Sequence, residues 1–381
     1  MSDAAPPTRL SGAAGHRSPA LDWMRGLVMV LMALDHSSEE LNAGRLFTDA
    51  TFAYQPGMPL PVAQFLTRWV THLCAPTFVF LTGTGLALSI GRRVAAGEAA
   101  WRLDRYLLLR GLIVAGCELW VSWFWMPPGR FLLQVLYAIG TSYVLMVPLR
   151  RLPARVLVGL AVAEIALGEA LTLRFGWGPP ETTPLAASLL FVPGRHGPLF
   201  IAYPALPWLA IMLLGWAFGG FLATKPSPRV LGLRLALSGL ALLALFAVVR
   251  GCNGYGNMGL LRDGAGPVQW LHVSKYPPSL TYVSLELGCM ALLLAVFTGV
   301  AQHRTARPHG VLLVLGRTPM FFYLLHIPVL SLSARWFGVN HALGLGGTYA
   351  AAVGVVALLY PFCRVYGRYK AAHPSGWPRY V

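Results

Sequence analysis

Ten long apolar runs constrain this chain more than any other feature of its sequence. Each has 18 to 27 residues, and a helix that crosses a membrane needs about 20. The 381 residues are 56% hydrophobic and 12% charged, whereas a soluble domain has about 25% charged residues. We therefore predict an all-α integral membrane protein, a polytopic bundle of about ten transmembrane helices, and exclude a soluble enzyme, a disordered chain and a disulfide scaffold. The predicted spans are residues 21–38, 64–90, 105–125, 131–149, 152–173, 204–223, 229–250, 276–300, 311–334 and 343–363.

The positive charges predict how the bundle lies in the membrane. The chain has 30 Lys and Arg residues against 14 Asp and Glu, a net charge of +16, which in a soluble protein would suggest a nucleic-acid partner. In membrane proteins, Lys and Arg gather instead in cytoplasmic loops. A cytoplasmic N-terminus puts 21 of the 30 basic residues on cytoplasmic segments and leaves the long connections 39–63, 174–203 and 251–275 outside. We therefore predict that both termini are cytoplasmic and that nucleic acid is not a partner.

The chain reads as one transmembrane domain with two short tails. We predict a polar cytoplasmic tail over 1–18, a single domain over 19–370 and a cytoplasmic tail over 371–381. The first 18 residues contain no apolar core, so we expect no removable signal peptide. The five cysteines are scattered without a C-x-x-C pair, so we predict neither a metal site nor a disulfide framework.

Several ionisable residues fall inside the apolar runs. A charge near the bilayer centre costs about 2.5–3.5 kcal/mol on insertion scales, so such residues are candidates for function, or else they pair to lock helices together. At a rise of 1.5 Å per residue, the three histidines reach a similar level in the outer half of the membrane, above Glu118 and Glu286. The acids are Asp35, Glu118, Glu164, Glu169 and Glu286, and the histidines are His36, His72 and His326.

The spacing of Arg25 and His36 suggests a ligand that is charged at one end. Eleven residues bring the helix back to nearly the same face, about 16 Å further along. A forked, permanently charged guanidinium suits phosphate, and an imidazole suits proton abstraction. An acyl-CoA, with phosphates at one end and a thioester at the other, would reach both groups. The alternative is that Arg25 is only a cytoplasmic anchor of the helix.

Five stretches of the sequence resemble the heparan-α-glucosaminide N-acetyltransferase catalytic-domain family, in its bacterial branch. The Arg-x10-His pattern also resembles the opening helix of the wider transmembrane acyltransferase superfamily. Together the stretches cover the chain from about residue 20 to 370. They are Leu21–His36, Trp69–Gly83, Tyr203–Trp208, Ser274–Ser279 and Gly316–His326.

The resemblance implies a multi-pass enzyme of the bacterial cytoplasmic (inner) membrane. Such an enzyme takes an acetyl group from cytoplasmic acetyl-CoA, needs no metal, and delivers the group to a sugar-type acceptor across the membrane. Arg25 would match the position that holds a CoA phosphate, and we also place Glu118 and His326 among the donor-binding residues. His36 would match the essential histidine of the Arg-x10-His superfamily.

The catalytic assignment leaves alternatives open. Asp35 points about 100° away from His36 on a helix, so it would partner His72 or His326 instead. His72 acting with Asp35 is therefore the alternative to His36 as base. Direct transfer and a covalent acetyl-histidine route are not separated by the sequence.

Aromatic and basic residues at the outer ends of spans are candidates for binding the acceptor, a saccharide or glycolipid. Aromatic residues at these positions also form the interfacial belt of membrane proteins, in contact with the lipid bilayer. The sequence leaves open whether the protein forms a homo-oligomer. The candidates are Tyr203, Trp208, Lys275 and Tyr276.

A proton-coupled transporter or flippase is the alternative function, since carriers also use buried Asp, Glu and His. The sequence contains neither an inverted repeat nor a matched pair of broken helices, which favours the enzyme. A scaffold without activity would leave Asp35, His36 and His72 without a role.

Overall fold

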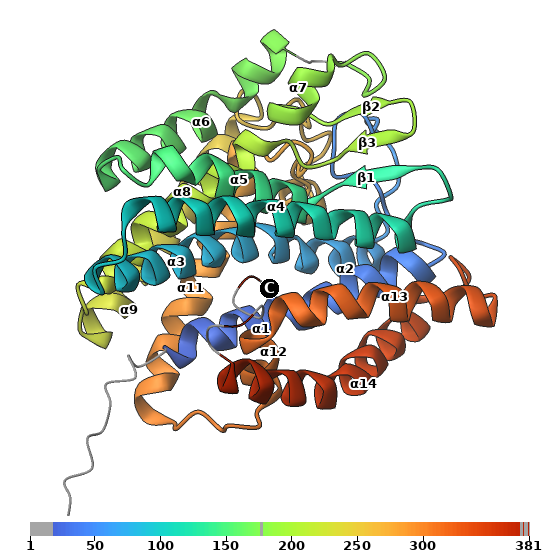
Figure 1. The fold of residues 1–381 in the computed structure, drawn as a ribbon. Coiled ribbons are helices and arrows are strands. Elements are labelled where there is room, and N and C mark those ends of the chain that lie inside the picture. Colours follow the sequence, from blue (N-terminus) through green and yellow to red (C-terminus); the bar gives the residue numbers. More distant parts are fainter. Residues whose placement is uncertain (1–17, 176–177, 374–375, 377–379, 381) are drawn as a thin grey trace, which may run out of the picture.

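The computed structural model describes residues 18–175, 178–373, 376 and 380, and almost all of its regular structure is helical (Figure 1). The helices are α1 (Pro19–Leu41), α2 (Val62–His72), α3 (Cys74–Ala95), α4 (Ala100–Trp125), α5 (Val135–Leu149), α6 (Ala154–Phe175), α7 (Leu185–Leu190), α8 (Ala205–Ala223), α9 (Pro228–Cys252), α10 (Pro267–Leu271), α11 (Leu280–His303), α12 (Val311–Arg317), α13 (Pro319–Phe337) and α14 (Leu345–Ala372). The strands are β1 (Phe131–Leu133), β2 (Gly194–His196) and β3 (Leu199–Ile201).

The helices confirm the prediction of a polytopic all-α membrane protein. Within the described residues, eight helical segments are long and apolar enough to cross a membrane, counting α2 and α3 as one. The other two predicted spans correspond to α1, which carries several charged residues, and to α5, which has only 15 residues. The count of ten spans and the cytoplasmic placement of both termini stay predictions.

A small sheet corrects one predicted boundary. Residues 131–133, predicted to begin a span, form β1, which pairs in parallel with β3, while β2 pairs antiparallel with β3. The main-chain groups of this segment therefore bond to a neighbouring strand, and the helix starts only at Val135. The prediction missed this because Phe131, Leu132 and Leu133 are as apolar as a helix start.

The predicted tails are only partly described. Apart from Ser18, the predicted N-terminal tail over 1–18 lies outside the described residues. Helix α14 continues to Ala372, two residues past the boundary predicted at 370. Of the predicted C-terminal tail over 371–381, only 371–373, 376 and 380 are described.

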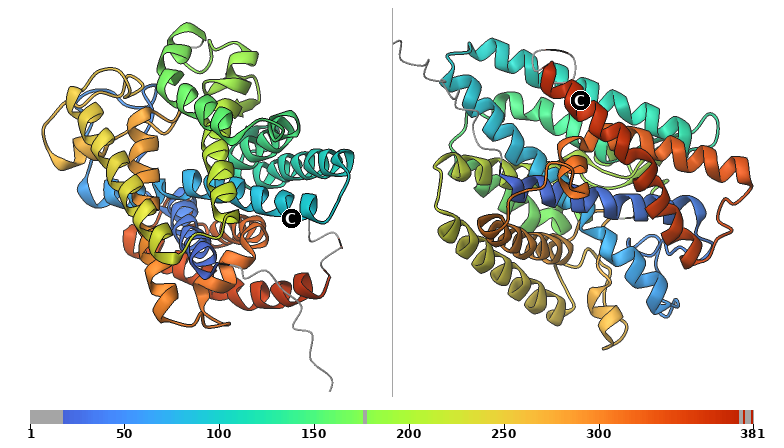
Figure 2. Two further views of the ribbon diagram at one scale, coloured as in Figure 1. Left: turned by 90° about the vertical axis from the view of Figure 1, so that its left-hand side faces the viewer. Right: turned by 90° about the horizontal axis from the view of Figure 1, so that it is seen from below.

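Helix α1 lies between the C-terminal helices α12 to α14 and the helices α3 to α8 (Figure 1, Figure 2). Its close contact with α12 depends on two glycines. A Cβ atom on Gly26 would overlap the backbone of Leu312, and one on Gly316 would overlap the backbone of Asp22. This approach buries α1 among other helices, so its polar side chains must find partners inside the protein.

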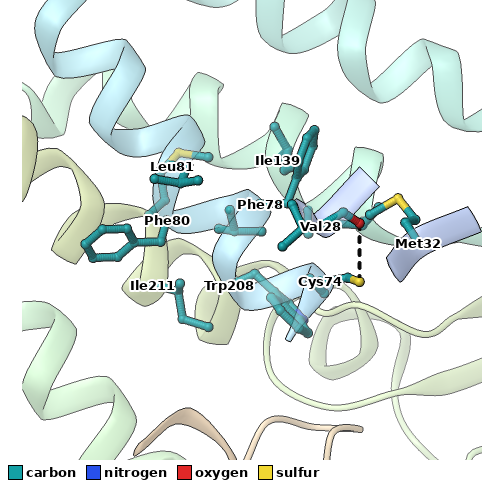
Figure 3. Close-up of a cluster of buried hydrophobic side chains, with 14 of the residues drawn as sticks. Val28, Met32, Cys74, Phe78, Phe80, Leu81, Ile139, Trp208 and Ile211 are labelled. Atoms are coloured by element: carbon teal, nitrogen blue, oxygen red, sulfur yellow. Dashed lines mark hydrogen bonds between the residues drawn. The ribbon is translucent and has the colours of Figure 1, made fainter. Parts of the chain in front are cut away.

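Apolar side chains from several helices pack around the middle of α1 (Figure 3). Val28 and Met32 of α1 lie against Cys74 and Phe78 of α3, and the Cys74 thiol hydrogen-bonds to the Val28 carbonyl oxygen at 3.5 Å. On the far side of α3, a Cβ on Gly215 of α8 would overlap the backbone of Phe80. The core therefore fixes α1 and α3 side by side.

Candidate active site

Two histidines from distant parts of the chain meet in the interior. His36 is near the end of α1, and its Nδ1 lies 2.6 Å from Nε2 of His326 on α13. The two rings are stacked, with centroids 4.9 Å apart and planes 9° from parallel. His36 and His326 are both buried, His326 completely. Their equal depth, predicted from the rise of the helices, is what allows this contact.

When both rings are neutral, the hydrogen bonds around His326 assign their protons. Nδ1 of His326 lies 3.0 Å from the carbonyl oxygen of Phe322, which only accepts, so this nitrogen carries the hydrogen. Nε2 of His326 is then the acceptor, and Nδ1 of His36 must donate to it. The remaining nitrogen, Nε2 of His36, keeps its lone pair. No hydrogen bond joins it to any residue that the structure describes.

A small pocket adjoins His36. Its volume is about 20 Å³, roughly the space of one water molecule. The rings of Trp125 and Tyr323 contact the His36 ring edge to face, at centroid distances of 4.6 and 5.9 Å, and so hold its orientation. The pocket is lined by Met32, Asp35, His36, Cys74, Ala75, Gln134, Val135, Tyr203, Lys275 and Tyr323.

Asp35 contacts arginines instead of either predicted histidine partner. Its Oδ1 accepts from Arg68 at 2.6 Å, from Thr71 at 3.0 Å and from Arg45 at 3.1 Å. The expectation that Asp35 would pair with His72 or His326 is therefore wrong. Arg68 reaches Asp35 from α2, and Arg45 reaches it from the loop between α1 and α2. The spacing of residues along the chain does not show that these long side chains meet Asp35.

His72 belongs to the same ionic network but not to the pocket. Its Nε2 lies 3.1 Å from Oδ2 of Asp49, which also accepts from Arg68 at 2.6 Å. Asp35 and His72 are thus linked through Arg68 and Asp49, with no direct hydrogen bond between them in the described part of the chain. The described residues that line the pocket do not include His72.

The predicted acceptor residues lie together, but only some reach the pocket. Tyr203 and Lys275 line it, whereas the fully buried Trp208 stacks behind Tyr203 with a centroid distance of 4.5 Å. Tyr276 contacts Tyr203 edge to face at 5.5 Å, and its hydroxyl accepts from Arg68 at 3.4 Å. Trp208 and Tyr276 therefore support the wall that Tyr203 and Lys275 form.

The other predicted donor-binding residues, Arg25 and Glu118, are not among the described residues that line the pocket. Arg25, near the start of α1, pairs with Asp22 at 3.2 Å and donates to the carbonyl oxygen of Leu81 at 3.3 Å. Its side chain keeps 22% of its surface exposed, so it is accessible. Glu118 is fully buried and accepts the backbone N–H of Tyr137 at 2.9 Å. Glu118 therefore stabilises the first turn of α5.

The remaining acids in the spans have separate surroundings. Glu169 accepts the backbone N–H groups of Gly256 at 2.5 Å and Met258 at 2.9 Å, and so holds the loop after α9. Glu164 lines an apolar cavity between α5, α6 and α8. Glu286 is buried on α11, and its Oε1 has no hydrogen-bond partner among the described residues. None of these three is among the residues lining the pocket at His36 in the described part of the chain.

Sequence reasoning missed Arg68, Asp49 and Tyr323. Arg68 had a usable signal, because a basic residue inside an apolar run, one helical turn before His72, needs an acidic partner. Asp49 lies in a connection between helices, where charged residues are ordinary. Tyr323 looked like one more aromatic residue in a span. Among the described residues, no group of three or more His, Cys, Asp or Glu side chains is arranged to hold a metal ion.

The network makes stability depend on acid pH. Burial raises the pKa of the Asp49 carboxyl, but the Arg68 charge and the His72 hydrogen bond lower it more, to well below its ordinary value. Such a group stabilises the fold above its unfolded pKa of about 3.9, and this contribution is lost as the pH falls further. Between about pH 6 and about pH 3, the thermal unfolding midpoint of the wild type in detergent should fall. We expect the midpoint of Asp49→Asn to fall less over the same range.

The control for this experiment is Glu181→Gln, since the Glu181 side chain is 60% exposed. Its pH dependence should match that of the wild type. An Asp49→Asn profile as steep as the wild-type profile would contradict the prediction.

Comparison with known proteins identifies the family. A model of the catalytic domain of heparan-alpha-glucosaminide N-acetyltransferase matches residues 17–247, more than half of the chain. The match contains Arg25, His36 and His72, whereas Lys275 and His326 follow it. No curated protein matches the sequence closely enough to be named as a relative. The chain is a multi-pass membrane protein, and it belongs to the heparan-α-glucosaminide N-acetyltransferase catalytic-domain family of acetyltransferases.

Proposed function

We propose that this protein transfers an acetyl group from cytoplasmic acetyl-CoA to a sugar-type acceptor on the opposite side of the membrane, with His36 as general base. One observation carries the proposal: His326 holds His36 in the tautomer whose Nε2 is free to take a proton. The family supplies the acetyl chemistry. The acceptor class, a saccharide or glycolipid, follows from the family resemblance.

Arg25 supports a cytoplasmic origin of the donor. It lies on the same continuous helix as His36, eleven residues earlier, which corresponds to about 16 Å along the axis. The partly exposed guanidinium suits a CoA phosphate, and the extended arm of CoA would run beside α1 toward the pocket. The pocket as described holds about one water molecule, so the acetyl group must displace side chains when it enters.

The proposed reaction is a direct transfer. The acceptor hydroxyl or amine attacks the thioester carbon as its proton passes to Nε2 of His36. The imidazolium then returns this proton to the leaving thiolate, so that CoA departs as a thiol and His36 is neutral again. General-base help of this kind contributes about 10²–10⁴-fold.

His36 is favoured over His72 because the two histidines have different surroundings. Nε2 of His72 hydrogen-bonds to Asp49, and its Nδ1 is buried without a partner among the described residues. We therefore assign His72 the task of holding Asp49 and the loop between α1 and α2. Asp35 has a similar task, since two arginines already occupy its carboxylate.

Replacing Arg25 tests the donor site. We expect Arg25→Gln to weaken acetyl-CoA binding by about 10- to 100-fold, because a hydrogen bond to a charged group contributes about 1.5–3 kcal/mol. Isothermal titration of the purified protein in detergent measures this. Arg317→Gln is the matched control, since Arg317 also pairs with Asp22 but is 44% exposed.

Two results would contradict the proposal. If the wild-type protein does not bind acetyl-CoA, the proposed function is wrong. If Arg25→Gln and Arg317→Gln weaken binding equally, Arg25 is only an anchor. Mass spectrometry of envelope glycans from cells with and without the protein would identify the acceptor, and uptake into vesicles in the absence of CoA would point to a carrier instead.

A further inference from the structure

Two hydrogen-bond donors line the His36 pocket without an acceptor. The Tyr323 hydroxyl is buried and has no hydrogen-bond partner in the described part of the chain. Lys275 is 2% exposed, and its ammonium lies 5.2 Å from the centroid of the Tyr276 ring, with no hydrogen bond or ion pair to a described residue. Buried polar groups nearly always have a partner, so two unpaired donors in one pocket need an explanation.

The carboxylates of the ionic network are already occupied, and Glu286, whose Oε1 has no hydrogen-bond partner among the described residues, forms no ion pair with Lys275. Asp35 accepts from Arg45, Arg68 and Thr71, and Asp49 accepts from Arg68 and His72. With Glu39, which pairs with Arg45 at 2.6 Å, this network holds three carboxylates and two guanidinium groups. The net negative charge of this network stabilises the buried Lys275 ammonium from a distance. The donors that touch the carboxylates all belong to residues other than Lys275. Lys275 therefore stays available for an anion in the pocket.

Rigid elements hold both donors beside the base. The backbone N–H of Lys275 donates to the carbonyl oxygen of Asp49 at 2.9 Å, so the ionic network also positions this residue. Tyr323 lies one helical turn before His326 on α13, and its ring contacts His36. The residues that carry the base, the hydroxyl and the ammonium thus line one small pocket from α1, α13 and the segment before α11.

We infer that Lys275 and Tyr323 form the oxyanion site of the acetyl transfer, which rests on the proposed function. When the acceptor attacks the thioester carbon, the π electron pair of the C=O bond moves onto oxygen. The Lys275 ammonium and the Tyr323 hydroxyl donate hydrogen bonds to this oxyanion. As the C=O bond re-forms, the C–S bond breaks and its electron pair leaves with sulfur. Both residues are then catalytic, because they touch a reacting atom.

An analogue of acetyl-CoA in which a trifluoromethyl ketone replaces the thioester tests this assignment without an acceptor. The ketone hydrates to a tetrahedral adduct, and such analogues of the transition state bind more tightly than substrates. We expect Tyr323→Phe and Lys275→Met each to lower the affinity for the analogue by about 10- to 100-fold more than the affinity for unmodified CoA. Lys275→Arg, which keeps the charge, should recover part of the affinity.

We also expect the same variants to change the kinetics of acetyl transfer. With glucosamine as the acceptor probe, loss of one oxyanion donor should lower kcat by about 10²–10³-fold and leave KM for acetyl-CoA nearly unchanged. Tyr360→Phe and Lys225→Met are matched controls, because Tyr360 bonds to His309 and Lys225 is exposed at the end of α8. Tyr323→Phe removes a single oxygen, so it keeps the test informative even if Lys275→Met folds poorly.

The outcomes separate this inference from the function on which it rests. Suppose that the wild-type protein binds CoA. The oxyanion assignment is wrong if the variants bind the analogue as tightly as the wild type does. It is also wrong if their affinities for CoA and for the analogue fall equally. If Lys275→Met raises only the KM for the acceptor, Lys275 recognises the acceptor and the assignment is again wrong. If the wild-type protein binds neither CoA nor the analogue, both proposals fail.

Discussion

Replacing His36 by alanine should reduce acetyl transfer by about 10²–10⁴-fold while leaving the affinity for acetyl-CoA close to that of the wild type. The reason is that Nε2 of His36 has a free lone pair. Among the ring nitrogens of His36 and His326, no other has a lone pair that the described residues leave free. Removal of the His36 ring takes away the proton acceptor, whereas the phosphate end of the donor is proposed to bind about 16 Å away, near Arg25. Transfer of radiolabelled acetyl to glucosamine, together with titration of acetyl-CoA, measures both effects.

His72→Ala is the matched control for the His36 variant. His72 is as deeply buried, but it bonds to Asp49 and lies outside the set of described residues that line the pocket. We expect this variant to lose stability and to keep a kcat much closer to that of the wild type. If His36→Ala keeps its activity and His72→Ala loses it, the roles of the two histidines are reversed.

Replacing Arg68 by alanine should lower the free energy of unfolding by about 3–5 kcal/mol, the range found when one partner of a buried ion pair is removed. Arg68 is 8% exposed and bridges Asp35 and Asp49, with N–O distances of 2.6 Å to each. Its loss would leave two buried carboxylates short of their main partner. The thermal or denaturant midpoint of the purified protein in detergent measures the effect.

Arg151→Ala is the control, because Arg151 pairs with Asp104 at 2.5 Å but is 58% exposed. Exposed pairs contribute only about 0–1 kcal/mol, so its midpoint should hardly move. Combining Arg68→Ala with Asp49→Asn should restore part of the lost stability, since one uncompensated charge disappears. Equal effects of Arg68→Ala and Arg151→Ala would contradict a buried network.

The network explains how a mostly apolar bundle keeps a polar site in order. Arg68 connects α1 to the loop that carries Asp49, and Asp49 in turn holds His72 through its side chain and Lys275 through its backbone. Damage to this network should therefore disturb the pocket as well as the stability of the fold. For that reason, the kinetic tests above use Tyr323→Phe, which leaves every ionic contact in place.

Much of the fold could be predicted from the sequence, because membrane insertion depends on local hydrophobicity. Each predicted apolar run corresponds to a described helix or helix pair, although the run from 131 to 149 begins as a strand. The equal depth of His36 and His326 was also predictable, since depth depends only on residue number and on the rise of the helix. Tyr203 and Lys275, which the sequence places at the outer ends of two spans, line the same pocket, and their role in binding the acceptor stays a prediction.

The partners of these residues could not be predicted in the same way. Asp35 pairs with Arg68 and Arg45 instead of a histidine, Glu118 stabilises the start of α5, and Trp208 supports Tyr203 from behind. Each of these contacts depends on how a helix is rotated about its axis and on which neighbour it packs against. Contacts such as those of Gly26 and Gly316 set that rotation for α1.

The sequence by itself therefore determined the membrane class, the family and the depth of the buried histidines, because hydropathy and helical rise act along one dimension. Only the tertiary structure decided that His326 holds His36 and that Lys275 and Tyr323 share its pocket. His36 precedes the other three residues by more than 200 positions in the chain. Lateral packing brings them together, and no spacing along the chain records which helix faces which.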